Sequence, residues 1–266
     1  YDVGIFVYVD SHCHLNMLDL TPYEGDLQLV LDQARQHGVK YFLCVAVTLN
    51  DHPELVTIAD RFQNVFISSG LHPNENPGEA FDLSILKKES SHPKVIAIGE
   101  TGLDYYRSSG EMKWQQDRFA LHIDCAKQCQ KPLIIHTRAA KEDTIAMMQS
   151  EKANEIGGVM HCFTEDWDTA KQALDLNFYI SFSGIVTFKN AVELQDVARK
   201  VPLERMLIET DCPYLAPIPH RGKPNVPAYV SHVAEFLAKL RGESLDKIAE
   251  ATTKNFFELF KPSLAQ

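Results

Sequence analysis

The sequence lacks an excess of basic residues. Lysine and arginine together number 26, against 36 aspartates and glutamates, so the formal net charge is −10 and the sequence pI is near 5.5. This balance argues against a broad basic surface of the kind that coats duplex DNA or an anionic membrane. A small basic pocket for a phosphate group remains compatible with it.

Long apolar runs and a cysteine framework are also missing. No run approaches the roughly 20 apolar residues of a membrane-spanning helix, and the early run GIFVYV is too short for a signal-peptide core and has no basic residue before it. The six cysteines are scattered, mostly through apolar runs, and do not have the spacing of a small secreted disulfide scaffold. We therefore expect reduced thiols in a cytoplasmic protein that does not bind membranes.

Short apolar runs and amphipathic runs alternate along the chain. The runs typical of strands are residues 5–12, 40–47, 65–72, 95–100, 132–137, 157–163, 178–184 and 205–211. The runs with helical periodicity are residues 25–38, 114–129, 168–177, 190–201, 227–240 and 246–260. Eight strands alternating with helices predict an α/β fold, a (β/α)8 TIM barrel, in a single domain over residues 1–266. An open doubly wound sheet is the alternative.

Polar residues at the ends of these runs favour the barrel. Several runs end in His, Glu or Asp, which are poorly suited to a core. They are well suited to the carboxyl ends of barrel strands, where active sites of this fold lie.

The stretch VDSHCHLN contains two histidines with one residue between them. Residues i and i+2 of a strand point to the same face, so His12 and His14 share a face and Cys13 points away from it. Asp10 has the same parity and is expected to orient an imidazole. Alone, this pattern is more often a pair of surface histidines at a strand end than a metal site.

The pattern gains weight because comparable residues end other strand-like runs. Residues with metal-binding side chains lie at the predicted ends of strands 1, 4, 5, 6 and 8, and they are His12, His14, Glu100, His136, His161 and Asp211. In a barrel these ends lie on one face, so we expect one metal centre. A single histidine at a strand end is more often hydrogen-bonded structure, but six such residues indicate a site.

The number of candidate ligands predicts two divalent ions. Catalytic ions commonly use about three protein ligands, so two ions sharing Glu100 fit better than one. His12, His14 and Asp211 would hold one ion, and His136 and His161 the other. The mixture of imidazoles and carboxylates suits Mg, Mn or Zn, and also Fe, without selecting among them.

Two further polar residues lie near predicted strand ends. His72, in GLHP, is expected to bind a phosphate oxygen or to transfer a proton, with loop capping as the alternative. Glu209 has the parity of Asp211, so it is expected to face inward and to support the ligands. A direct role for Glu209 in proton transfer is less favoured.

Several motifs together resemble a known family. DSHCHL, GLHP, GETGLDYY, HTR, HCF, ISFSG, ETDCPYL and HRGKPN occur in this order between about Val9 and Phe260. The chain resembles the TatD family of metal-dependent deoxyribonucleases, within the amidohydrolase-like barrel superfamily. The resemblance implies a divalent-metal centre and hydrolysis of DNA phosphodiester bonds, with exonuclease action on single strands. Two positions depart from the family. In HTRAA an alanine follows the arginine, where the family often has an acidic residue, and Cys212 stands where Ser or Ala is usual.

The expected mechanism is attack on phosphorus by a water activated by two metal ions. Asp211 is the first candidate to accept the water proton and His72 is the second. Basic and aromatic residues in the loops that follow the strands are candidates to hold the strand, and they are Tyr105, Arg107, Arg138, Arg221 and Lys223. Each basic residue taken singly is more often a solvated surface charge. The expected partner is single-stranded DNA, and a monomer is favoured.

Two other enzyme classes remain open. Metal-dependent amidohydrolases and deaminases also use His-x-His and an aspartate after strand 8, but many have a lysine where Glu100 stands here. Cleavage of the ester of an aminoacyl-tRNA would use the same ions. A binding module without activity is the least favoured reading, because so many ligands have little use as structure alone.

Overall fold

The computed structural model describes residues 7–75, 81–108 and 110–262, and its strands belong to one sheet of eight, in the order β1-β2-β3-β4-β5-β6-β7-β8. Each pair whose register is defined is parallel, and β1 also contacts β8. The strands are β1 (Tyr8–Cys13), β2 (Val39–Cys44), β3 (Val65–Ser69), β4 (Val95–Asp104), β5 (Leu133–Arg138), β6 (Gly158–Met160), β7 (Phe178–Phe182) and β8 (Met206–Ile208). This topology confirms the predicted (β/α)8 barrel.

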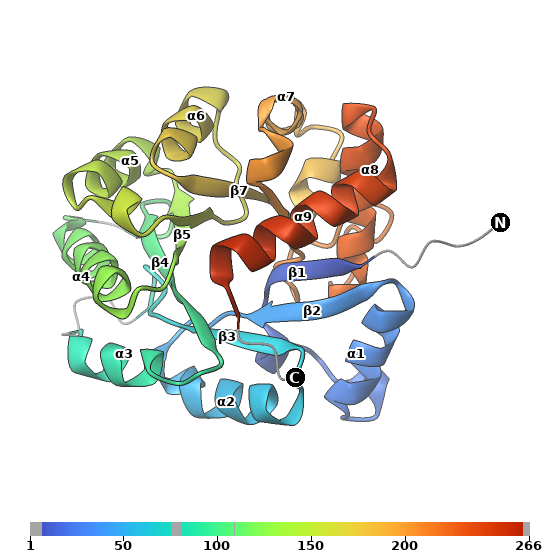
Figure 1. The fold of residues 1–266 in the computed structure, drawn as a ribbon, viewed down its shortest axis with the longest axis horizontal. Helices are drawn as coiled ribbons and strands as arrows, with labels where there is room; N and C mark the ends of the chain where they lie inside the picture. Colours follow the sequence, from blue (N-terminus) through green and yellow to red (C-terminus); the bar gives the residue numbers. More distant parts are fainter. Residues whose placement is uncertain (1–6, 76–80, 109, 263–266) are drawn as a thin grey trace. The chain divides into compact units, whose positions relative to one another are not determined.

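Helices lie between successive strands and follow the last one (Figure 1). They are α1 (Leu27–Gln36), α2 (His52–Arg61), α3 (Leu83–Ser90), α4 (Lys113–Cys129), α5 (Lys141–Ser150), α6 (Trp167–Asp175), α7 (Val192–Lys200), α8 (Val230–Arg241) and α9 (Leu245–Phe260). Helix α1 shows how the sequence specifies one of them. The Asp26 carboxylate accepts a hydrogen bond from the Gln28 backbone N–H at 3.0 Å, which caps the helix. None of the helices in the described part of the chain is both long and apolar enough to cross a membrane.

Three helices were absent from the sequence prediction, namely α2, α3 and α5. Each is short and presents few apolar positions to the core; α2, for example, buries only Leu55 and Ala59. The number of buried apolar residues does not by itself explain the omission, because α6 (Trp167–Asp175), which the sequence did predict, buries only Ala170 and Ala173 among its apolar residues.

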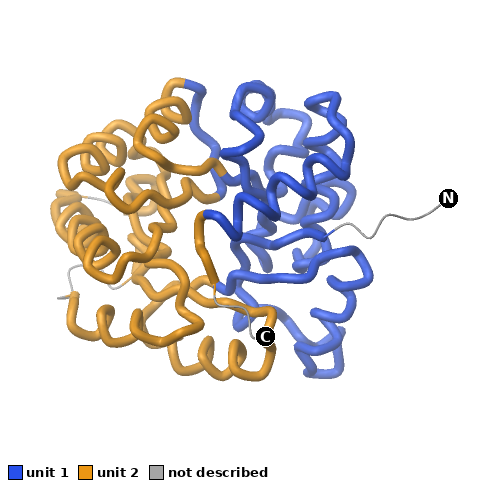
Figure 2. The backbone as a smooth tube through the Cα atoms, viewed as in Figure 1, with its two compact units in different colours: residues 1–44, 162–167, 181–258 blue, residues 45–161, 168–180, 259–266 orange. Residues whose placement is uncertain are grey.

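The described chain divides into two compact units (Figure 2). Unit 1 comprises residues 1–44, 162–167 and 181–258, and unit 2 comprises residues 45–161, 168–180 and 259–266. Candidate ligands occur in both units. The single domain over residues 1–266 stays a prediction.

Strand β4 is buried along its whole length, and glycines let it lie very close to β5. Gly102 pairs with His136 in the register of the two strands. Its φ of 132° is unfavourable for other residues, and a Cβ atom there would overlap the His136 carbonyl oxygen. The backbone that carries Glu100 and the backbone that carries His136 are therefore held in close contact.

Helix α4 fixes the loop that follows β3. His122 is fully buried, its Nε2 accepts a hydrogen bond from the Leu71 N–H at 3.1 Å, and its Nδ1 bonds to the Arg118 carbonyl at 2.8 Å. Arg118 in turn donates to the Glu75 carbonyl at 2.6 Å. The loop between these contacts carries His72.

Burial lowers the pKa of His122 to about 4, which predicts a stability loss in mild acid. A histidine whose folded pKa is depressed contributes its stability above the unfolded pKa, about 6.5, and loses it as the pH falls toward the folded value. The expected loss of unfolding free energy from this group is about 2 kcal/mol between about pH 7.5 and pH 5. Urea unfolding at both pH values should therefore show a smaller pH dependence for His122→Gln than for the wild type. His37→Gln, at an exposed histidine, is the control and should keep the full dependence.

Candidate metal centre

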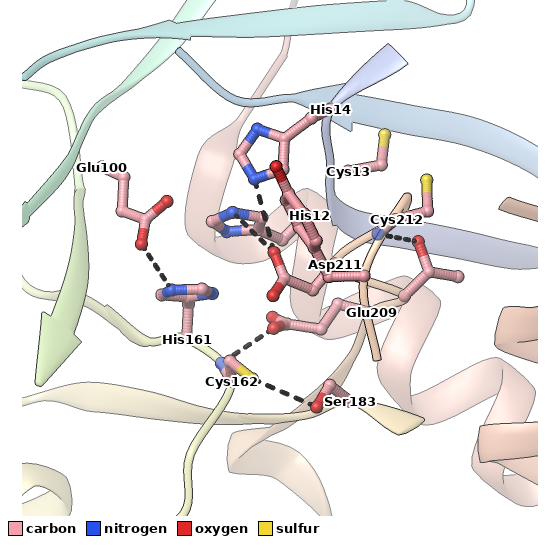
Figure 3. A network of polar contacts seen from close by, with 12 residues as sticks. His12, Cys13, His14, Glu100, His161, Cys162, Ser183, Glu209, Asp211 and Cys212 are labelled. Carbon is pink, nitrogen blue, oxygen red and sulfur yellow. Dashed lines mark hydrogen bonds and ion pairs between the residues drawn. The ribbon is translucent and has the colours of Figure 1, made fainter. Parts of the chain in front are cut away.

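The ligand candidates of unit 1 are His12, His14 and Asp211, here called the unit 1 cluster. The Asp211 Oδ1 lies 3.3 Å from His14 Nε2 and 3.6 Å from His12 Nε2 (Figure 3). Two donors bound to one tetrahedral ion at about 2.0–2.1 Å are themselves roughly 3.3–3.5 Å apart. The donor separations in this cluster therefore fit a divalent ion, and the two histidine side chains are 1% and 4% exposed.

Asp211 is held in place by its backbone. It lies beyond the end of β8, has a left-handed φ of 57°, and donates its N–H to the His12 carbonyl at 2.9 Å. The residue before Asp211, Thr210, is tied to β1. The Asp10 carboxylate accepts hydrogen bonds from the Thr210 N–H at 2.9 Å and from the Thr210 hydroxyl at 2.6 Å. Burial raises the pKa of Asp10 to about 8. Asp10 was expected to orient an imidazole. Its carboxylate also accepts from the His12 backbone N–H at 3.4 Å, so it holds both the residue next to Asp211 and the backbone of one histidine of the cluster.

Glu209, whose parity predicted an inward-facing side chain, is fully buried. Its Oε1 accepts from the Cys162 N–H at 2.8 Å (Figure 3). Its Oε2 accepts from the Ser181 hydroxyl at 2.5 Å. These bonds attach the segment after β6 to β7 and to the residues that precede Asp211. The contacts agree with a supporting role for Glu209.

The ligand candidates of unit 2 gather around one carboxylate oxygen. Glu100 Oε1 lies 2.8 Å from His161 Nε2, 3.1 Å from His136 Nδ1 and 3.5 Å from His72 Nε2. We call His72, Glu100, His136 and His161 the unit 2 cluster. Three imidazoles around a single carboxylate that is 5% exposed form a donor set that suits Zn or Mn. His72, which was expected to contact phosphate or to move a proton, thus lies among the ligand candidates.

Asp104 contacts a histidine of this cluster and was not among the residues predicted from the sequence. It is 1% exposed, and its Oδ2 lies 3.1 Å from His136 Nε2 and accepts from Asn74 Nδ2 at 2.8 Å. Although burial acts in the opposite direction, the hydrogen bonds from His136 and Asn74 hold the pKa of Asp104 well below its usual range. An ionised Asp104 keeps the Nε2 proton on His136 and leaves Nδ1 as the nitrogen that faces Glu100.

Replacing Asp104 with asparagine is expected to lower metal affinity or activity by about 10- to 100-fold, because carboxylates that orient a ligating histidine have effects of this size. The asparagine keeps the shape but no longer stabilises the tautomer of His136. Metal titration followed by competition with a chelator would measure the change. Asp117→Asn is the control in unit 2, because this exposed carboxylate pairs with Lys113 on α4, and an equal effect there would contradict the assignment.

The histidines of the unit 2 cluster differ in basicity. Burial lowers the pKa of His72 to about 4, so this imidazole is neutral near pH 7 and its nitrogen lone pair is available. Burial also acts to lower the pKa of His136, but hydrogen bonds to Asp104 and Glu100 outweigh it and raise the value. Neutral imidazole is the form that binds metal ions.

The substrate-binding candidates in unit 2 are surface residues with partners of their own. The Arg138 guanidinium lies 4.0 Å from the ring centroid of Tyr106, an exposed aromatic residue. The Tyr105 hydroxyl donates to Asp143 at 2.7 Å. Arg107 is exposed, and its backbone N–H bonds to Asp104 at 3.1 Å. Arg138 is the last residue of β5, not a loop residue as expected.

The candidates in unit 1, Arg221 and Lys223, belong to the proline-rich segment after β8. Both are exposed, and the Arg221 guanidinium lies 4.2 Å from the ring centroid of Phe188. The segment contains turns closed by backbone bonds, including Lys223 N–H to the His220 carbonyl at 3.0 Å. The two side chains are presented from an ordered backbone.

Comparison with known proteins places the chain among metal-dependent hydrolases. The family described as TatD related DNase matches residues 9–261. The metal-dependent hydrolase YcfH of Escherichia coli strain K12 is 48% identical to this chain over 252 residues, which cover 95% of each protein. The metal-dependent hydrolase YabD of Bacillus subtilis is 38% identical, and the match covers 95% of this chain and 98% of YabD. The crystal structure of the TatD homologue YjjV from E. coli K12 superposes with a TM-score of 0.90 at 28% identity, covering 97% of this chain and 99% of that one. The chain belongs to the TatD family of metal-dependent hydrolases.

Proposed function

We propose that the protein is a deoxyribonuclease that removes nucleotides from the end of single-stranded DNA with the help of two divalent ions. The observation that carries the proposal is that ligand atoms of His12, His14 and Asp211 lie within 4.8 Å of one another, as do those of His72, Glu100 and His136. Members of both clusters lie at or just beyond carboxyl ends of strands, where enzymes of this fold carry their active sites. The family description supplies the class of substrate.

Bound divalent ions would activate a water molecule and neutralise charge on the attacking and leaving oxygens of a phosphodiester. The protein's own part is to hold the ligands and to move a proton. Asp211 Oδ1 faces both histidines of its cluster, and Asp211 is the first candidate to accept the proton of the water. Neutral His72 is the second candidate, and Glu209 keeps the neighbouring backbone in place.

The phosphate backbone would be held by cations in the loops and strand ends around the clusters. Arg138, whose guanidinium is already placed by Tyr106, is the strongest candidate because it lies two residues beyond His136 in β5. Arg107, Arg221 and Lys223 would follow the strand, with Tyr105 nearby. A few local cations of this kind are compatible with a chain of net charge −10. We propose a monomer that acts in the cytoplasm.

The decisive experiment is a substrate panel with purified protein and Mg, Mn or Zn. The panel contains single-stranded and duplex DNA, RNA, aminoacyl-tRNA and amide substrates. We expect stepwise shortening of the single-stranded DNA and loss of this activity in His136→Ala. Turnover of an amide or of aminoacyl-tRNA without any shortening of DNA would assign the site to one of the other two enzyme classes.

A further inference from the structure

Tyr214 is an exposed aromatic residue beside the unit 1 cluster. It is 55% exposed, whereas most large apolar side chains in the described ranges are buried. Its ring centroid lies 6.4 Å from that of His14, with 66° between the ring planes. At this steep angle the two rings do not stack face to face, so His14 does not satisfy the tyrosine as a stacking partner.

The backbone that carries Tyr214 is tied to the backbone of Asp211. The Tyr214 N–H donates to the Asp211 carbonyl at 3.0 Å. The side-chain amide of Asn225 donates to the Tyr214 carbonyl at 2.6 Å and to the Thr210 carbonyl at 2.9 Å, so it bridges the two ends of the segment that contains Asp211. Asn225 itself is 1% exposed. The position of the Tyr214 backbone is therefore set together with that of a candidate ligand.

An exposed ring on a backbone held in this way is suited to binding a flat aromatic group. Its backbone is already ordered, so stacking costs little further conformational entropy. Every nucleobase has a π face, which makes stacking on tyrosine tolerant of sequence. In a nucleotide the base is joined through its sugar to the phosphate, so a ring next to a candidate metal cluster, whose ion would meet the phosphate, is placed to meet the base.

Another exposed tyrosine shows why Tyr214 stands out. The face of Tyr106 in unit 2 is covered by the Arg138 guanidinium at 4.0 Å. Tyr106 is therefore better suited to positioning Arg138 than to receiving a base.

From these contacts we infer that Tyr214 is a stacking platform for the nucleobase adjacent to the phosphate that is cleaved. The inference rests on the proposed function, because it names the part of a nucleic acid that this side of the site recognises. It assigns to Tyr214 a role in substrate affinity and none in the chemical step.

The test pairs a change in the protein with a change in the DNA. Tyr214→Ala, Tyr214→Phe and Leu29→Ala, an exposed apolar residue of α1, are compared with the wild type. The oligonucleotides are a labelled single strand with normal terminal nucleotides and the same strand with abasic residues at both ends. Dissociation constants are measured by fluorescence anisotropy with Mn on versions of both strands whose terminal linkages resist hydrolysis, and KM and kcat are measured separately with Mn on the cleavable strands.

Tyr214→Ala is expected to weaken binding of the normal strand about 5- to 100-fold and to leave binding of the abasic strand unchanged within about twofold. Tyr214→Phe should restore the wild-type affinity, because the ring and not the hydroxyl makes the contact. Leu29→Ala should have no effect. In turnover the loss should be found in KM, with kcat little changed.

If Tyr214→Ala weakened binding of the normal and the abasic strand equally, or of neither, the inference would be overturned. The proposed function would still stand in that case, provided that the wild-type protein shortens single-stranded DNA. A wild-type protein that neither binds nor shortens any oligonucleotide would overturn both. A loss confined to kcat would also contradict the inference, since a stacking platform acts on binding.

Discussion

Replacing Glu100 with alanine should lower the bound metal from the proposed two ions per chain to one or none and reduce hydrolysis at least about 1,000-fold. Glu100 Oε1 is the atom that the three histidines of its cluster share, at 2.8, 3.1 and 3.5 Å. Without it, neutral imidazoles alone would have to balance the charge of an ion in a buried site. Ions supply several kcal/mol of transition-state stabilisation in such hydrolases, and each 1.36 kcal/mol corresponds to about a factor of ten in rate.

Elemental analysis of protein dialysed against trace metal would give the stoichiometry, and initial rates on a single-stranded oligonucleotide would give the activity. Glu100→Gln keeps the shape and removes the charge, so it separates a steric effect from an electrostatic one. Glu89→Ala is the matched control in unit 2, because this half-buried glutamate accepts a hydrogen bond from Ser69 outside the cluster. An unchanged metal count in Glu100→Ala would remove Glu100 from the proposed ligands.

Replacing Asp211 with asparagine should reduce kcat by about 100- to 10,000-fold, the range that general base catalysis contributes. Asparagine offers an oxygen but accepts no proton near neutral pH. It also tolerates the left-handed φ of 57° found at this position, so the backbone bond from residue 211 to the His12 carbonyl should persist.

The experiment is steady-state kinetics over a range of pH, with metal content measured on the same samples. A loss of metal in step with the loss of activity assigns Asp211 a ligand role, and a loss of kcat with metal retained assigns it the proton. Cys212→Ser is the control, because Cys212 is the next residue and its buried thiol interacts with that of Cys13, not with a side chain of the cluster (Figure 3). Activity of Asp211→Asn within tenfold of the wild type would be incompatible with either role.

Local periodicity was enough to predict several features of the site. The i, i+2 rule placed His12 and His14 together, and the same rule turned Glu209 inward. The order of strands and helices was sufficient for the fold class, because each strand is a short apolar run bounded by polar residues.

Features that depend on distant partners escaped the sequence. Asp104 has the parity of Glu100, but the predicted strand ended at Glu100, whereas β4 continues to Asp104. The partner of Asp10 is Thr210, two hundred positions further along the chain, and no local pattern encodes such a pair. The stacking of Arg138 on Tyr106 depends on the rotamers of two long side chains, which periodicity does not report.

The tight contact of Gly102 with His136 sets limits on how this protein can be changed. No side chain fits between the two strands at that point, so a library that varies Gly102 would consist mostly of unfolded or inactive members. The exposed residues Arg107 and Arg221 are not bound by such packing. Directed evolution toward new substrates should therefore succeed by diversifying the loops that carry Arg107 and Arg221 while β4 and β5 are kept unaltered.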